Sequence, residues 1–118
     1  GQQSQSRLAA FEDKDSMGIA VSTLDAEFPK DKIDILKIDV EGHEEFVLRG
    51  GGSLLADSLR APRVIYIEVH PYAWPSLGVT DSSLLTLLMG KGYAVSDLEG
   101  RPVAAIKEYG EIIARKRD

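Results

Sequence analysis

Four ionisable side chains follow two apolar segments of the sequence, and their types could support acid–base or metal chemistry. Asp39 and Glu41 end the first segment, and Glu68 and His70 end the second. Within each pair the residues are two positions apart, so their side chains project to one face if the strand continues that far. If the two strands are neighbours, the four groups converge on one edge of a sheet.

Crowded carboxylates beside an imidazole can do several kinds of chemistry. Burial and like charge push the pKa values of such carboxylates apart, so that one of them can act as a general base. The others could bind a hard cation or accept hydrogen bonds from an ammonium or hydroxyl group of a cofactor. The alternative interpretation is that the acids are solvated strand ends and His70 caps a loop, because structural polar clusters also perturb pKa values.

Other candidate motifs are weaker. His43 follows the Gly42 turn and could be a further ligand or base, but a histidine that begins a helix is more often simply exposed. The glycine run 50–52 follows a helix and lacks the Lys-Ser/Thr of a P-loop, so it predicts a helix end. Tyr72 and Trp74 could either wall a substrate pocket or pack against the edge of the sheet.

The elements that must position these residues follow from the hydrophobic pattern. Residues 33–40 and 64–69 are apolar and β-branched, as expected of strands buried on both faces of a parallel sheet. Helices are predicted at 44–49 and at 53–59, where Ser53 can cap the second. The intervening chain suits a crossover connection, which makes a βαβ unit.

The rest of the chain completes an α/β pattern. Residues 1–16 are polar and read as loop or linker, and 19–24 reads as a short strand that leads into a helical turn ending before Pro29. A capped helix is predicted over 81–88, and the segments 93–98 and 111–115 are predicted as closing antiparallel strands. Strands that alternate with helices indicate a doubly wound, mainly parallel sheet with a terminal antiparallel hairpin.

Composition excludes several classes of function. The chain of 118 residues has a net charge of −5 and no basic stripe, so nucleic acid is not an expected partner. It has no cysteine, which excludes disulfides, thiolate metal sites and cysteine nucleophiles. No apolar run approaches the roughly 20 residues that span a bilayer, and the first residues are unlike a signal peptide, so we expect a soluble cytoplasmic protein without a membrane partner.

Several blocks of the sequence are specific enough to suggest a family. Residues 21–25 read VSTLD, 33–44 read IDILKIDVEGHE and 47–50 read VLRG. With IEVH at 67–70 and Gly92-Tyr93, they closely resemble the FkbM family of methyltransferases over roughly residues 19–100.

The resemblance implies a Rossmann-like class I methyltransferase fold, S-adenosylmethionine as the methyl donor, and transfer to an oxygen, often a hydroxyl on a natural product or sugar. It places Asp39 and Glu41 at the end of the fourth strand, beside the donor's methionine end and the acceptor. Glu68 and His70 would end the fifth strand. Asp39, Glu41 and His70 are therefore candidate catalytic residues, and Asp39, Glu41 and Glu68 are candidate cofactor-binding residues.

The sequence departs from the family at its start. The family's first strand, its glycine-rich turn and the acidic residue that holds the ribose should precede residue 1. We therefore interpret residues 1–18 as a linker or a remnant of the preceding part of the domain, and 19–118 as its C-terminal half. The strand at 33–40 would then be an exposed apolar edge, which predicts self-association into a homo-oligomer or marginal stability, and an inactive isolated chain.

Three functions stay open at this point. The leading hypothesis is methyl transfer to a small-molecule acceptor, with Asp39 or His70 accepting the proton of the acceptor. The second is a metal-assisted hydrolase in which Asp39, Glu41, Glu68 and His70 hold Mg²⁺ or Mn²⁺. The third is a non-catalytic half-domain that folds with a partner or with a second copy of itself.

Overall fold

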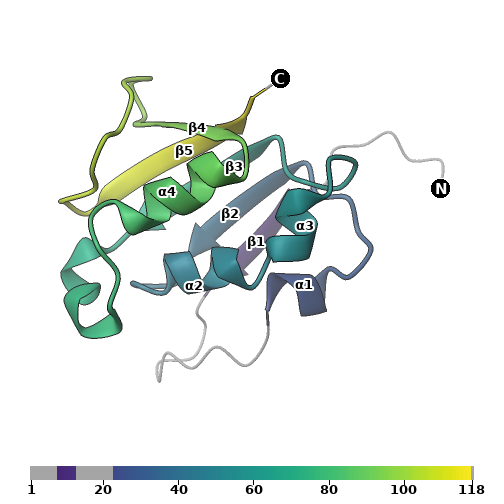
Figure 1. Cartoon of the computed structure of the whole chain (residues 1–118), viewed down its shortest axis with the longest axis horizontal. Helices are drawn as coiled ribbons and strands as arrows, with labels where there is room; N and C mark the ends of the chain where they lie inside the picture. The colour runs from purple at the N-terminus through teal and green to yellow at the C-terminus, as the bar shows by residue number, and fades with distance from the viewer. Residues whose placement is uncertain (1–7, 13–22, 118) are drawn as a thin grey trace.

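The computed structural model describes residues 8–12 and 23–117, which form a sheet with helices packed against it (Figure 1). The strands of the described chain are β1 (Leu8–Glu12), β2 (Ile35–Asp39), β3 (Val64–Val69), β4 (Tyr93–Ser96) and β5 (Gly110–Lys116). Its α-helices are α1 (Leu24–Glu27), α2 (Glu44–Arg49), α3 (Gly52–Ala56) and α4 (Ser83–Gly90). Two short 3-10 helices, η1 (Pro71–Ala73) and η2 (Pro75–Leu77), follow β3.

The sheet is mixed, with the strand order β1-β2-β3-β5-β4. β1, β2 and β3 run parallel, with Leu36 opposite Ile65 and Ile38 opposite Ile67. β5 is antiparallel to both of its neighbours, β3 and β4. The predicted βαβ unit and the antiparallel ending are therefore confirmed, and the carboxyl ends of β2 and β3 lie at the same edge of the sheet.

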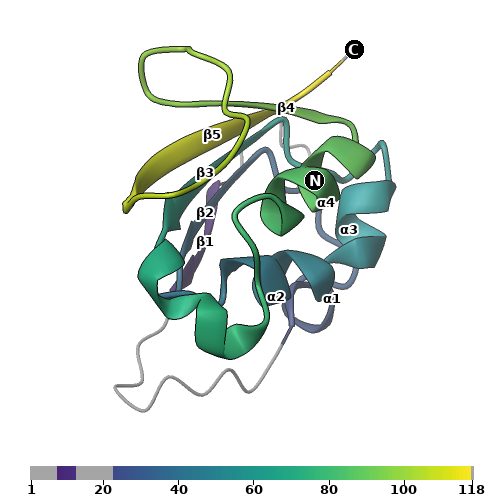
Figure 2. The same ribbon diagram turned by 60° about the vertical axis from the view of Figure 1, so that its left-hand side comes forward.

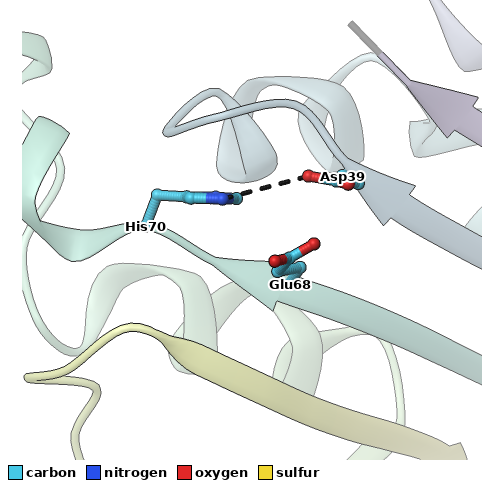
Figure 3. A group of neighbouring side chains, drawn as sticks. All are labelled: Asp39, Glu68 and His70. Atoms are coloured by element: carbon cyan, nitrogen blue, oxygen red, sulfur yellow. Dashed lines mark ion pairs between the residues drawn. The ribbon is translucent and has the colours of Figure 1, made fainter.

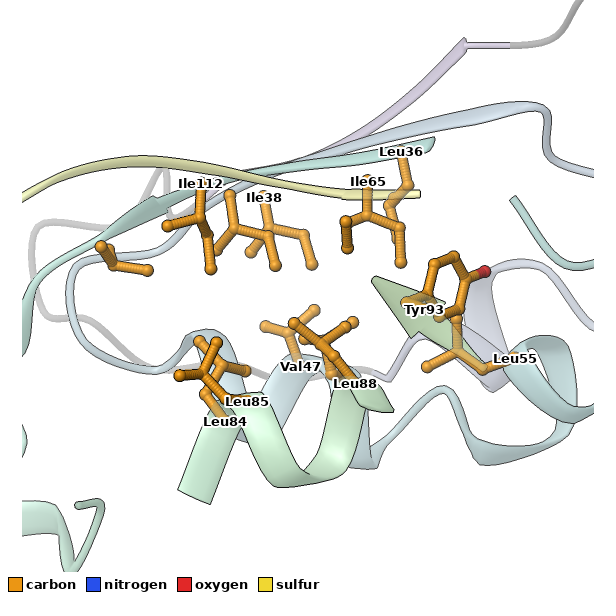
Figure 4. Close-up of a cluster of buried hydrophobic side chains, with 14 of the residues drawn as sticks. Leu36, Ile38, Val47, Leu55, Ile65, Leu84, Leu85, Leu88, Tyr93 and Ile112 are labelled. Carbon is orange, nitrogen blue, oxygen red and sulfur yellow. The ribbon is translucent and has the colours of Figure 1, made fainter. Parts of the chain in front are cut away.

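The four described helices lie on one face of the sheet (Figure 2). Figure 4 shows sheet side chains such as Leu36, Ile38 and Ile65 pointing toward Val47 and Leu88 on the helices. Burial along β3 alternates from residue to residue, which is the pattern of a sheet covered on one side.

The prediction that both faces of β2 and β3 are buried is wrong for the described part of the chain. Lys37 is exposed, and Tyr66 and Glu68 are only half-buried, because no described helix covers their face. The doubly wound arrangement stays a prediction.

Residues 8–12 correct the prediction that 1–16 is a loop or linker. They form β1, which pairs in parallel with β2 along its whole length, Leu8 opposite Ile35 and Glu12 opposite Asp39. A short apolar patch shows too little periodicity to be recognised as a strand, but pairing satisfies the open backbone groups of β2. β2 is therefore not the exposed edge that we expected. Self-association and the division of the domain stay predictions.

The helices α1 and α3 are linked through their N-termini. Thr23 caps α1 by accepting from the Ala26 backbone N–H at 3.0 Å, and the predicted helical turn is confirmed. The Asp25 carboxylate accepts from the backbone N–H groups of Ser53 at 2.9 Å and Leu54 at 3.0 Å. The second helix predicted at 53–59 is therefore confirmed as α3, but it ends at Ala56 and Ser53 does not cap it, because Asp25 supplies the acceptor from another helix.

The remaining elements agree more closely with the sequence pattern. The predicted strand at 19–24 lies mostly outside the described residues. β4 ends earlier than predicted because the Asp97 side chain accepts from the backbone N–H groups of Glu99 and Arg101, both at 2.9 Å, and turns the chain. α4 has eight residues, and none of the described helices is long and apolar enough to cross a membrane.

Candidate active site at the carboxyl ends of β2 and β3

Three of the four predicted residues gather at one edge of the sheet. Asp39 is the last residue of β2 and Glu68 is the penultimate residue of β3. Because Ile38 is opposite Ile67, Asp39 and Glu68 are on the same face of neighbouring strands. One ligand atom each from Asp39, Glu68 and His70 lies within 4.8 Å of the other two (Figure 3).

Glu41 does not join this cluster. β2 ends at Asp39, so the alternation of side chains stops before Glu41, which is exposed and has a positive φ of 46°. Gly42 continues the turn with φ of 103°, and a Cβ at this position would lie 2.6 Å from the Ala73 Cβ. The tight turn therefore needs glycine, and it points the chain into α2. The catalytic and cofactor-binding roles of Glu41 stay predictions.

His70 is the most buried member of the cluster, with 5% of its surface exposed. Its Nδ1 lies 3.1 Å from Oε2 of Glu44, and its Nε2 lies 3.9 Å from Oδ1 of Asp39. The first distance is a hydrogen bond and the second is too long for one. The imidazole is thus held from one side, while its second nitrogen faces the two carboxylates (Figure 3).

Glu44 holds the imidazole and was not among the predicted residues. It is fully buried in the first turn of α2. Its carboxylate accepts from the Gly42 backbone N–H at 2.6 Å, the His70 backbone N–H at 3.3 Å and Trp74 Nε1 at 3.2 Å. In the sequence Glu44 reads as an ordinary acidic residue at a helix start, and only its position in the FkbM-like block could have singled it out.

Two tyrosines flank the histidine. The rings of His70 and Tyr72 are 6.0 Å apart and edge-to-face, and those of His70 and Tyr109 are 5.3 Å apart. The Tyr109 hydroxyl donates a hydrogen bond to Glu68. Both tyrosines are exposed, whereas Trp74 is buried in the core. The two alternatives for these aromatic residues therefore separate: Tyr72 lies at the site and Trp74 packs beneath it.

Two further residues need a role assigned: Tyr109, which the sequence did not indicate, and His43, which it offered only as a weak candidate. Tyr109 precedes β5 and lies 41 positions from Glu68, so no local signal indicates its contact. His43 lies outside the cluster and packs its ring against Phe46, with centroids 5.9 Å apart. It makes no side-chain cap for α2.

The surroundings of Glu68 change its pKa. Burial raises the pKa of Glu68 above its ordinary value, and the hydrogen bond and the like charge of Asp39 raise it further. The charge of His70 acts in the opposite direction. Glu68 therefore holds a proton more readily than an isolated glutamate does.

The arrangement offers oxygen and imidazole ligands that suit a divalent cation such as Mg²⁺ or Mn²⁺. It equally offers carboxylates for an ammonium group and an imidazole nitrogen that can accept a proton from a hydroxyl. All of these chemistries require small molecules to reach the edge of the sheet. Asp39 and Glu68 are only half-buried, so their carboxylates are accessible from solvent.

Comparison with known proteins assigns the family. Residues 1–95 of the 118-residue chain match the Methyltransferase FkbM domain. The matched range contains Asp39, Glu44, Glu68 and His70 but ends before Tyr109. No curated protein and no solved structure matches the chain. Because the match covers most of its length and includes the residues that form the cluster, the chain belongs to the FkbM methyltransferase family.

Proposed function

We propose that this chain serves S-adenosylmethionine-dependent methyl transfer to a hydroxyl group of a small molecule or sugar. The observation that carries the proposal is the grouping of His70 Nε2 with the carboxylates of Asp39 and Glu68 at the carboxyl ends of parallel strands. Open α/β sheets bind their ligands at this edge. Membership of the FkbM family supports methyl transfer as the reaction.

The acidic edge suits the methyl donor, which carries positive charges on its sulfonium and ammonium groups. Asp39 and Glu68 are half-buried, and Glu41 is exposed in the next turn, so their carboxylates would hold the ammonium group by charge-assisted hydrogen bonds. When bound, the donor supplies a methyl group on a positively charged sulfur that an oxygen nucleophile displaces in line.

His70 is the proposed proton acceptor. Its Nε2 has no hydrogen bond to any residue that the structure describes, and its nearest charged neighbour is Asp39 at 3.9 Å. An acceptor hydroxyl that entered between them could pass its proton to Nε2 as the new bond to carbon forms. Asp39 would then stabilise the imidazolium. The sequence left the role of the base open between Asp39 and His70, and we assign it to His70.

The flanking tyrosines suggest where the acceptor lies. Tyr72 and Tyr109 are exposed, and each ring lies against the ring of His70, at centroid distances of 6.0 Å and 5.3 Å. Aromatic faces pack well against the flat surfaces of sugars and phenols. We therefore propose that an acceptor of this shape lies between the two tyrosines with its hydroxyl toward Nε2.

Calorimetric titration of S-adenosylmethionine into the chain tests the donor site. We expect binding that weakens in Asp39→Ala, because the variant removes a carboxylate from the proposed ammonium site. An absence of binding to the chain would contradict the proposal that these strand ends hold the donor. Glu108→Ala, an exposed acid outside the cluster, is a matched control for general charge.

A radiolabelled methyl-transfer assay with a panel of sugars and phenols tests the base. In His70→Asn the amide can replace the Nδ1–H donor to Glu44 but has no group in place of Nε2. We expect kcat to fall by about 10²–10⁴-fold, the usual contribution of a general base. Undiminished turnover in this variant would rule out His70 as the proton acceptor.

Metal-assisted hydrolysis is the second candidate, favoured by the ligand atoms of Asp39, Glu68 and His70 within 4.8 Å of one another. The measurement is the melting temperature with and without Mg²⁺ or Mn²⁺. A metal-dependent rise of the melting temperature that is lost in Asp39→Asn would support a cation site, since bound metal stabilises only the folded state. Equal melting temperatures with and without metal would end this candidate.

A further inference from the structure

Four nitrogen atoms converge on the buried carboxylate of Glu44. Oε1 accepts from the His70 backbone N–H and from Trp74 Nε1, and Oε2 is 2.6 Å from the Gly42 nitrogen and 3.1 Å from His70 Nδ1. Two backbone amides and an indole can only donate hydrogen bonds. Only the imidazole nitrogen can be either a donor or an acceptor.

The geometry decides which nitrogen of His70 carries the proton in the neutral ring. An ionised carboxylate only accepts, so a hydrogen bond to Glu44 requires the proton on Nδ1. The competing acceptor, Asp39, is 3.9 Å from Nε2, beyond hydrogen-bond distance. A proton on Nε2 would leave the Nδ1 lone pair facing a carboxylate that has no proton to donate.

We infer that Glu44 is a positioning residue that fixes the Nδ1–H tautomer of His70 and thereby directs the lone pair of Nε2 toward the edge formed by Asp39 and Glu68. The catalytic importance of Glu44 rests on the proposed function, because the tautomer matters to a base that takes a proton at Nε2. The tautomer itself does not depend on any donor or acceptor molecule.

The neighbouring Glu45 shows that a buried carboxylate in α2 need not bind a histidine. Glu45 is also buried, but its carboxylate accepts from Arg49 Nη2 at 2.8 Å and from the Ser83 hydroxyl. A permanently charged guanidinium therefore offsets the charge of Glu45. Glu44 has no lysine or arginine partner among the described residues, and its one ionisable partner is His70.

Imidazole ¹⁵N NMR on the full chain tests the inference directly. The sequence contains only two histidines, His43 and His70, so a His43→Asn variant assigns the signals. In the neutral ring of His70 we expect the protonated type of nitrogen signal at Nδ1 and the unprotonated type at Nε2. The opposite assignment in the unmodified chain would overturn the inference without any variant.

Glu44→Gln is the perturbation that keeps the shape of the side chain. We expect its NH₂ group at the Oε2 position, against Nδ1 and the Gly42 N–H, because the Oε1 position faces two fixed donors, the His70 backbone N–H and Trp74 Nε1. We expect the proton of the neutral ring to move to Nε2. In a serine-protease triad the corresponding change of an orienting carboxylate to an amide selects the wrong tautomer and lowers kcat by about 10⁴-fold. Glu45→Gln, one residue along the same helix, should leave the His70 signals unchanged.

The outcomes separate this inference from the proposed function. An unchanged tautomer in a folded Glu44→Gln chain would overturn the positioning role of Glu44. If that variant does not fold, the spectrum of the unmodified chain still decides. An Nδ1–H tautomer together with a chain that neither binds S-adenosylmethionine nor transfers methyl groups would support the Glu44–His70 arrangement and reject the proposed reaction.

Discussion

Helix α2 carries two neighbouring buried carboxylates, Glu44 and Glu45, which have different partners. Glu44 turns toward the carboxyl end of β3, where it meets His70 and Trp74, and Glu45 turns toward the start of α4, where it meets Ser83. Both carboxylates are almost completely buried. The role of a buried carboxylate therefore depends on its partners. A guanidinium offsets the charge of Glu45, whereas N–H groups and a histidine at the open edge of the sheet form the hydrogen bonds of Glu44.

The largest expected difference between the two sides is in the rate of methyl transfer. Glu44→Gln should lower kcat by about 10²–10⁴-fold, because His70 would present a protonated Nε2 to the acceptor. Glu45→Gln acts only on packing between helices, so we expect a change of less than about threefold, as for substitutions away from the reacting groups. Steady-state assays with the acceptor panel provide the measurement, and similar losses in both variants would break the comparison.

The next largest difference concerns folding. Glu44→Ala leaves the N–H groups of Gly42, His70 and Trp74 buried without their acceptor, and we expect the free energy of unfolding to fall by about 3–5 kcal/mol. Glu45→Ala releases Arg49, whose side chain is 58% exposed and can return to water, so the expected loss is about 1–2 kcal/mol. Urea denaturation of both variants measures the difference, and equal losses would show that the partners do not matter.

A third difference comes from the turn that leads into the Glu44 side of α2. Gly42→Ala adds a methyl group that would lie 2.6 Å from the Ala73 Cβ at a residue with φ of 103°. Backbone strain and overpacking together predict a loss of about 2–4 kcal/mol. Gly78→Ala is the control, since Gly78 has φ of 75° but open space around its Cβ, and its cost should be about 1 kcal/mol. Equal melting temperatures for the two variants would contradict the close approach.

The smallest effect is electrostatic and depends on pH. The folded-state pKa of Glu68 is raised above its ordinary value of 4.5, chiefly by burial and then by Asp39. The folded chain therefore binds the proton more tightly than the unfolded chain, and stability falls as the pH rises from 4.5 through the raised pKa. Glu68→Gln removes this penalty and should be about 0.2–1 kcal/mol more stable than the unmodified chain at neutral pH. Denaturation at a series of pH values should show the advantage disappearing below the ordinary pKa.

Much of the fold could be predicted from local patterns. The apolar runs around Ile38 and Ile67 identify the two parallel strands, because the side chains of a strand that face the core must be apolar whatever lies beyond it. The glycines that follow Arg49 end α2 for reasons local to the backbone. β1 could not be predicted, since its strand conformation depends on pairing with β2, and the cap of α3 comes from Asp25 in another helix.

For the candidate site, the sequence by itself determined that acids and a histidine follow two apolar strands, since strand ends and residue order are local properties. Only the tertiary structure decided which of them meet. Glu41 leaves the cluster because β2 ends before it, and Glu44 enters because the turn after β3 returns His70 and Trp74 to α2. Contacts between residues 26 and 30 positions apart depend on how whole elements pack. The hydrophobic periodicity of the sequence predicts the elements, but it does not indicate which polar residues meet when they pack.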